Sequence, residues 1–108
     1  MRRSGEEFER KVHFELEHGL YFLFIEWPDN PVSKWHWLDR EGKIMVMDSM
    51  GLDHLKASSR LVENSLESFL LRRSGPKRSQ TEVTKALEPL IREKLEELKA
   101  TLRKKIDF

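Results

Sequence analysis

Several features that would announce a function are missing from this chain of 108 residues. Cysteine is absent, which excludes disulfide bonds and thiolate metal ligands and is compatible with a reducing compartment. No apolar run approaches the roughly 20 residues of a membrane span. The N-terminal residues MRRSGEEFER lead into no hydrophobic segment that would make a signal peptide. A cytoplasmic protein that does not contact a membrane is therefore the expectation.

Motifs of familiar catalytic sites are missing as well. The chain has 5 glycines but neither a glycine-rich phosphate loop nor a serine in a nucleophile elbow. Asp53 and His54 are a poor acid–base pair, because adjacent residues on a helix point in different directions. The other histidines, His13, His18 and His36, are not spaced like a helix-borne pair of metal ligands. We expect no enzyme activity, no cofactor and no bound metal.

Charge is abundant and unevenly distributed. Charged residues make up 36% of the chain and apolar residues 38%, with a net charge of +1. Residues 1–53 carry 7 Lys/Arg against 11 Asp/Glu, a net −4, whereas residues 54–108 carry 13 against 8, a net +5. Such a split favours contacts between the two halves, or with a protein partner, over uniform adhesion to phosphate.

Residues 11–27, KVHFELEHGLYFLFIEW, predict a β-hairpin. Apolar and polar residues alternate over 12–17, the period of a strand with one buried face. His18 and Gly19 offer a turn, and the apolar run LYFLFIEW suggests a strand covered on both faces. The alternative for residues 8–18 is a helix with apolar residues at steps of four. The residues at these steps are Phe8, Val12, Leu16 and Leu20.

A loop and a second hairpin follow. PDNPVS, residues 28–33, contains two prolines, so neither a helix nor a central strand can run through it. WHWLDREGKIMVM, residues 35–47, places the polar turn DREG between two apolar stretches. Together the two hairpins predict a β-rich part of three or four short strands at about residues 8–48.

The tryptophans of the second hairpin have a structural and a functional interpretation. Trp35 and Trp37 fall on one face of the predicted strand and His36 on the other. In the structural interpretation, Trp35, Trp37, Ile44 and Val46 form the inner face of the sheet. In the functional interpretation, Trp35, His36 and Trp37 bind a protein partner, because tryptophan is frequent in recognition surfaces.

The rest of the chain predicts two long helices. Apolar residues recur at helical spacing over about 49–73, with Asp48 or Ser49 available as the N-cap. The residues SGPKRS interrupt this pattern and predict a linker at 74–79. A second helix, with a charged outer face, is expected at 80–106.

The helix at 80–106 carries an apolar stripe of the coiled-coil kind. If the stripe faces another protomer, the protein is a homodimer, and Leu98 and Leu102 bind the partner; if it packs only on the helix at 49–73, the stripe gives no reason to expect a dimer. Pro89 interrupts the stripe, so the helix either kinks or begins there. The stripe consists of Val83, Leu87, Leu90 or Ile91, Lys94 or Leu95, Leu98, Leu102 and Ile106.

A basic junction offers an alternative function. The residues RRSGPKR contain Arg72, Arg73, Lys77 and Arg78, which could contact the phosphates of a nucleic acid. Against this, the N-terminal half is acidic and would repel a duplex. Nucleic-acid binding is therefore the second hypothesis, behind binding to a protein.

The middle of the chain resembles small proteins encoded by bacteriophages and prophages. The resemblance consists of a Trp, a turn with Gly, an Ile/Val strand, and a Met and "HL" that open a helix. These residues are Trp37, Gly42, Ile44, Val46, Met50, His54 and Leu55. It implies no activity, but it implies an accessory protein of a phage or mobile element that binds a host or phage protein. The hypothesis is a single α+β domain over 1–108 that acts as a non-enzymatic protein-interaction module.

Overall fold

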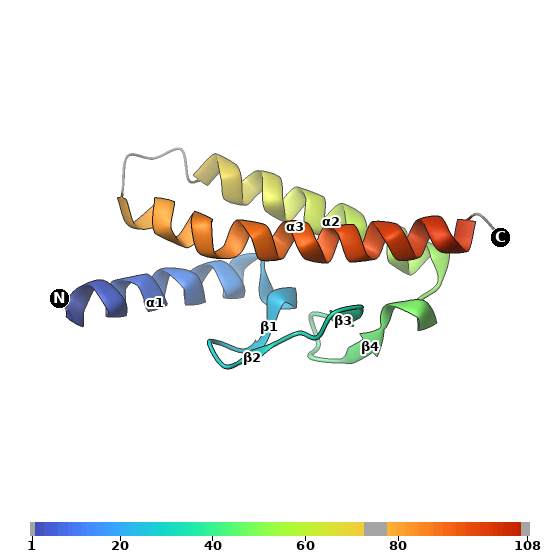
Figure 1. The fold of residues 1–108 in the computed structure, drawn as a ribbon, viewed down its shortest axis with the longest axis horizontal. Helices are drawn as coiled ribbons and strands as arrows, with labels where there is room; N and C mark the ends of the chain where they lie inside the picture. Colours follow the sequence, from blue (N-terminus) through green and yellow to red (C-terminus); the bar gives the residue numbers. More distant parts are fainter. Residues whose placement is uncertain (1, 73–77, 107–108) are drawn as a thin grey trace.

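Helices dominate the structure, and two small antiparallel hairpins accompany them, which confirms the α+β class (Figure 1). The computed structural model describes the backbone of residues 2–72 and 78–106 and the side chains of residues 6–71 and 82–106. The elements are α1 (Arg2–His18), the 3-10 turn η1 (Tyr21–Leu23), β1 (Phe24–Glu26), β2 (Asn30–Pro31), β3 (His36–Leu38), β4 (Ile44–Val46), the 3-10 turn η2 (Met47–Ser49), α2 (Leu52–Arg72) and α3 (Arg78–Ile106).

Helix α3 is the spine of the molecule. It runs nearly the whole length, with α2 antiparallel to it on one side and α1 along its first half on the other (Figure 1). Its apolar stripe is buried between these helices and the hairpins, which makes packing within the protomer the correct alternative. The buried stripe residues are Val83, Leu87, Ile91, Leu95 and Leu98. Within the described ranges, no helix has both the length and the hydropathy of a membrane span.

The expected strand over residues 11–18 is wrong, because this segment is the last half of α1. Val12, Leu16 and Leu20 lie in the core at steps of four, as the alternative helix required. Phe14, which a strand would bury beside Val12 and Leu16, is 49% exposed. The turn expected at His18 is instead the end of the helix, where the N–H groups of Gly19 and Leu20 donate to the Glu15 carbonyl.

The apolar run LYFLFIEW is also not one continuous strand. Phe22 and Leu23 are buried in η1, and only Phe24–Glu26 forms β1. Its partner β2 lies in the proline-containing segment that was expected to be a loop, so the first hairpin falls about ten residues later than predicted. Pro31 is compatible with this position because β2 is an edge strand of a two-stranded sheet.

The second hairpin is confirmed. β3 and β4 pair antiparallel, with Trp37 opposite Met45. The turn between them places Gly42 at φ 86°, a conformation that favours glycine. The carboxylate of Asp39 accepts hydrogen bonds from the N–H groups of Glu41 and Lys43 at 2.9 and 2.8 Å. The turn is therefore closed by its own side chain.

The predicted helices exist with shifted ends. α2 begins at Leu52, because Asp48 and Ser49 form η2 instead of capping the helix. α3 begins at Arg78 and continues through Pro89, so the alternative that a helix begins at Pro89 is wrong. Most of the linker predicted at 74–79 lies outside the described residues.

Two small polar residues, Ser58 and Ser59, are buried on α2. The hydroxyl of Ser59 has no hydrogen-bond partner among the described residues. A buried hydroxyl without a partner costs free energy, and alanine is a better helix former than serine. We expect Ser59→Ala to leave the free energy of unfolding unchanged or to raise it by up to about 1 kcal/mol, measured by urea denaturation. A loss of stability would instead show that the hydroxyl is bonded in solution.

Candidate functional site

The β3–β4 hairpin has one face in the core and an opposite face that is open along β4. Trp37 on the inner face is 2% exposed and stacks on Phe22, with ring centroids 5.3 Å apart. Its cross-strand neighbour Met45 is half-buried against the same core. Because side chains alternate along a strand, the residues before and after Trp37 and Met45 point to the other face of the sheet.

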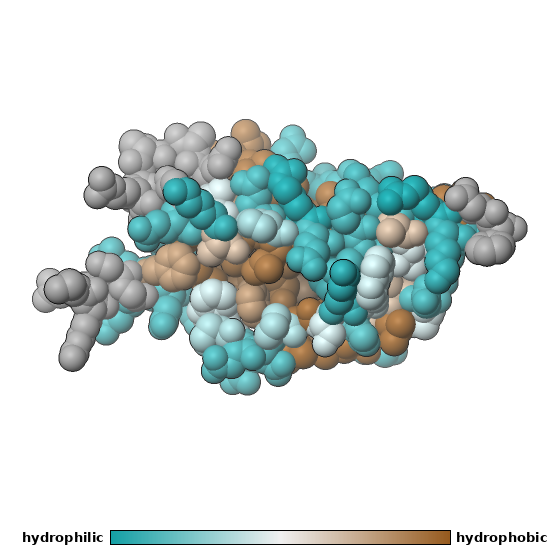
Figure 2. Space-filling view, in the orientation of Figure 1, coloured by the Kyte–Doolittle hydropathy of each residue, from teal (hydrophilic) through white to brown (hydrophobic). Residues whose placement is uncertain are grey.

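The opposite face, which we call the hairpin face, consists of His36, Leu38, Ile44 and Val46. His36 lies opposite Val46 and Leu38 opposite Ile44, so each pair shares this side of the sheet. Leu38 is buried, but Ile44 and Val46 are 44% and 47% exposed. Figure 2 shows hydrophobic residues along the lower edge of the molecule, where β4 runs in Figure 1. A strand that is apolar on both faces is usually covered on both, and here one face is uncovered.

A buried ion pair on α3 holds this hairpin in place. The Lys94 ammonium and the Glu97 carboxylate are 3.0 Å apart, and their side chains are 6% and 5% exposed. Lys94 also donates to the carbonyl oxygens of Ser33 and His36, at 3.1 and 3.0 Å. The three N–H donors of the ammonium are thus engaged within the protein, so Lys94 is a structural cation rather than a nucleophile or base.

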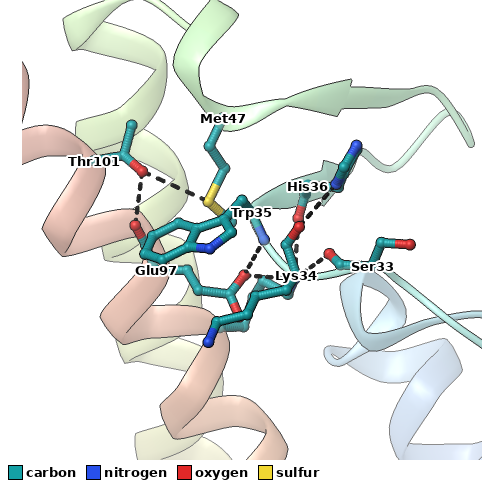
Figure 3. Close-up of polar contacts among 8 residues, drawn as sticks. Ser33, Lys34, Trp35, His36, Met47, Glu97 and Thr101 are labelled. Atoms are coloured by element: carbon teal, nitrogen blue, oxygen red, sulfur yellow. Dashed lines mark hydrogen bonds and ion pairs between the residues drawn. The ribbon is translucent and has the colours of Figure 1, made fainter.

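The carboxylate of Glu97 fixes the backbone just before β3. It accepts a hydrogen bond of 2.8 Å from the Trp35 N–H (Figure 3). Trp35 has φ 66°, a left-handed conformation that costs a bulky residue roughly 1–3 kcal/mol. The hydrogen bond to a buried, charged acceptor offsets this cost. The position of Trp35 is therefore imposed by α3.

The Trp35 indole lies against α3, beside Met47 and Thr101 (Figure 3). These residues line a hollow of about 290 Å³ together with Asp48, Ala100 and Lys104. Its polar groups bond within the protein: Thr101 donates to the Glu97 carbonyl at 2.9 Å, and Lys104 lies 3.6 Å from the Asp48 carboxylate. The hollow therefore presents an indole edge rather than a catalytic pair.

The structure separates the five residues expected to bind a partner. Trp35 is 44% exposed and His36 half-buried, so both reach the surface. Trp37 and Leu98, at 2% and 0% exposure, lie in the core. Their burial corrects the expectation that they bind a partner, because a buried side chain cannot contact one. Leu102 is partly buried against the core. The stripe on α3 thus serves the protomer itself.

The remaining candidate groups do not converge. His13 and His54 are exposed, the His18 ring bonds to the Phe14 carbonyl, and the His36 ring bonds to the Lys34 carbonyl. In the part of the chain that the structure describes, no three His, Asp or Glu side chains are grouped as metal ligands. Asp53 is exposed beside His54 at the start of α2.

The basic junction lies largely outside the described residues. Arg73 and Lys77 fall in the gap between α2 and α3, and Arg72 and Arg78 are the helix ends on either side of it. Their side chains are not among those described. Nucleic-acid binding by these four residues stays a prediction.

Two features of the site were missed from the sequence. Ile44 and Val46 were assigned to the inner face with the tryptophans, whereas Met45 and Met47 take that side. Strict alternation of Ile, Met, Val and Met leaves either pair free to point inward, so only the contact with the core decides. The Lys94–Glu97 pair had a weak signal, because Lys94 falls within the apolar stripe of α3.

Comparisons with protein-family models, with curated proteins and with solved structures found no match.

Proposed function

We propose that this protein is a non-enzymatic interaction module that binds a protein partner through the hairpin face. One observation carries the proposal: Ile44 and Val46 are 44% and 47% exposed on a strand whose other face packs in the core. Covering the exposed half of each side chain would contribute roughly 1 kcal/mol. Two exposed apolar side chains on the same face of one strand are typical of a recognition site.

The hairpin is also held in a way that favours binding. Its connection to α3 runs through Lys94 and Glu97, which anchor the backbone at Ser33, Trp35 and His36. A surface that is already ordered loses little conformational entropy when a partner covers it. The rigid attachment therefore supports recognition by a preformed surface.

The partner that fits this surface presents an apolar patch with mixed charge around it. Glu41, Lys43 and Asp48 flank the hairpin face and are all exposed. The resemblance of the segment from Trp37 to Leu55 to phage and prophage proteins supports an accessory role of this kind, in the cytoplasm of a bacterial host. Trp37 and Leu55 of that pattern are buried, so these two residues form the core rather than the binding surface.

The proposal is tested by a pull-down that compares matched surface variants. We expect Ile44→Ser combined with Val46→Thr to lose a protein that the wild-type chain captures from a bacterial lysate treated with nuclease. Leu71→Ser combined with Phe14→Ser is the control, because it removes two exposed apolar side chains, 69% and 49% exposed, that lie on α2 and α1 rather than on the hairpin. The control should capture the same protein as the wild type. Captured proteins are identified by mass spectrometry, and folding of each variant is checked by circular dichroism.

Two outcomes would contradict the proposal. If the hairpin variant and the control capture the same proteins, the hairpin face is not the binding surface. If all capture depends on nucleic acid and disappears with nuclease, the basic junction at Arg72–Arg78 becomes the better hypothesis, and binding should then weaken steeply with salt.

A further inference from the structure

The free edge of β4 presents an ordered set of backbone groups. On the side of β3, the Asp39 N–H donates to the Lys43 carbonyl and the Met47 N–H donates to the Trp35 carbonyl, both at 2.9 Å. Because successive residues of a strand direct these groups to opposite sides, the N–H and C=O of Ile44 and Val46 point away from β3. In Figure 1, β4 runs along the lower edge of the molecule, so this edge faces solvent.

One of these groups is already bonded within the chain. The Ser49 hydroxyl donates to the Val46 carbonyl at 2.6 Å. A carbonyl oxygen has two lone pairs, so it can accept a second hydrogen bond. The edge of β4 therefore offers two N–H donors and two carbonyl acceptors over three residues.

We propose that β4 pairs antiparallel with β4 of a second copy of this chain, about a two-fold axis at Met45. The inference deepens the proposed function and rests on it, because it names a second copy as a partner that extends the same hairpin. Ile44 of each copy then lies opposite Val46 of the other, and all the outward backbone groups are paired. The result is a four-stranded sheet with both hairpin faces on one side. A two-fold contact of this kind is self-complementary, as closed dimers require.

The register is selected by the pairing groups. A shift of two residues toward the turn would place Ile44 opposite Ile44 and Val46 opposite Gly42. A shift the other way would place Ile44 opposite Asp48, which already belongs to η2. Only the register centred on Met45 pairs both residues whose backbone groups face outward.

The charges that flank the strand favour a second copy over a foreign strand. Lys43 precedes β4 and Asp48 follows it, and both are exposed. Antiparallel pairing brings the Lys43 end of each copy to the Asp48 end of the other, so opposite charges meet twice by symmetry. Glu41 on the exposed turn would likewise approach Lys104, which lies 3.6 Å from Asp48 with its side chain 65% exposed.

The paired edge is short, so a weak dimer is expected. Three residues of strand and two apolar side chains per copy make a contact below about 1,200 Å², the lower limit of standard-size interfaces, and we expect a dissociation constant on the order of 10–100 μM. Sedimentation equilibrium over about 1 μM to 1 mM of the full chain spans this range. The mass should rise with concentration from 12.9 kDa towards twice that value.

Val46→Pro is the sharpest variant, because it removes one outward N–H while an apolar side chain stays at this position. Val46 has φ −76° and ψ 134°, which proline adopts without strain, and its N–H is not used in pairing with β3. We expect the dimer to weaken at least about tenfold, while circular dichroism and the unfolding transition stay close to the wild type. Val46→Thr is the matched control for the side chain: it keeps the N–H and the β-branched shape, so the dimer of Val46→Pro should be at least about tenfold weaker than that of Val46→Thr.

A charge exchange provides a second, independent test. Lys43→Glu and Asp48→Lys should each weaken the homodimer, because each places like charges together twice. An equimolar mixture of the two variants should associate more tightly than either alone, since both contacts again join opposite charges. The charge-exchange test still decides whether the dimer forms as proposed even if Val46→Pro does not fold.

Several results would overturn the inference. They are a monomer at every concentration, a dimer that Val46→Pro leaves intact, or a mixture of charge variants that associates no better than its components. Failure of the dimer is distinguishable from failure of the proposed function. If the Val46→Pro chain is monomeric but still captures the partner protein, the hairpin face stays the proposed binding surface. If the chain dimerises but its Ile44/Val46 variant captures the same proteins as the wild type, the dimer stands and the hairpin face is not the surface that binds the other protein.

Discussion

Glu97→Ala is expected to lower the free energy of unfolding by about 3–5 kcal/mol, because it leaves the buried Lys94 ammonium without its counter-charge. It also leaves the Trp35 N–H without its acceptor, at a residue whose backbone has φ 66°. A small domain has roughly 5–15 kcal/mol of stability in total, so the loss is a large fraction of it. Urea denaturation followed by circular dichroism measures the change. Hydrogen exchange should show the Trp35 amide losing protection in the variant.

The exposed pair Glu63–Lys99 supplies the control. Its charged atoms are 3.2 Å apart, close to the 3.0 Å of Lys94–Glu97, but its side chains are 50% and 38% exposed. Glu63→Ala should therefore cost less than about 1 kcal/mol. Combining Lys94→Met with Glu97→Ala should cost less than the sum of the single changes, because no unpaired charge remains. Equal effects of Glu97→Ala and Glu63→Ala would contradict the role given to the buried pair.

Leu98→Ala is expected to lower the free energy of unfolding by about 2–5 kcal/mol, as for other leucines removed from a packed core. Leu98 is 0% exposed in the second half of α3 and belongs to the hydrophobic core. Leu98→Asp would bury an unpaired carboxylate and should prevent folding altogether. Loss of structure, rather than dissociation of a folded dimer, is thus the expected result of a charge at this position. Thermal unfolding followed at the helical circular dichroism signal tests this.

Leu71→Ala is the matched control for the core substitution. Leu71 is the same residue type on the neighbouring helix and is 69% exposed. Its truncation should change the free energy of unfolding by no more than about 0.5 kcal/mol. A folded Leu98→Asp chain that merely sediments as a smaller species would instead show that the stripe on α3 lies between protomers.

Local patterns were sufficient where a single period dominated. The two long helices and the β3–β4 hairpin follow from apolar spacing and from the turn at Gly42, and all three exist. Near the N-terminus two periods overlap, because Val12 and Leu16 satisfy both alternation and steps of four. Phe14 separates the two interpretations, and its exposure follows from how α1 packs on α3. The apolar pattern of residues 11–18 alone does not predict how α1 packs on α3.

The candidate site depended still more on distant contacts. Lys94 was visible as a member of a helical stripe and Glu97 was not, and the partners of this pair, Ser33, Trp35 and His36, are 58 to 62 positions away in the sequence. Ile44 and Val46 were visible as strand residues, but not as the exposed side of that strand. Either face of β4 is apolar enough to enter a core. The stacking of Trp37 on Phe22 selects the face that does.

By itself, the sequence determined the α+β class, the two long helices and the lack of recognisable catalytic motifs, because residue type and periodicity act over a few neighbouring positions. Only the tertiary structure decided that the apolar stripe of α3 packs inside the protomer and that a lysine and a glutamate are buried as a pair. It also decided that β4 has an exposed apolar face and a free edge. Each of these depends on which segments meet across roughly sixty residues of chain. Whether a side chain is buried depends on contacts between distant segments. The surface proposed to bind a partner can therefore be recognised only in the folded molecule.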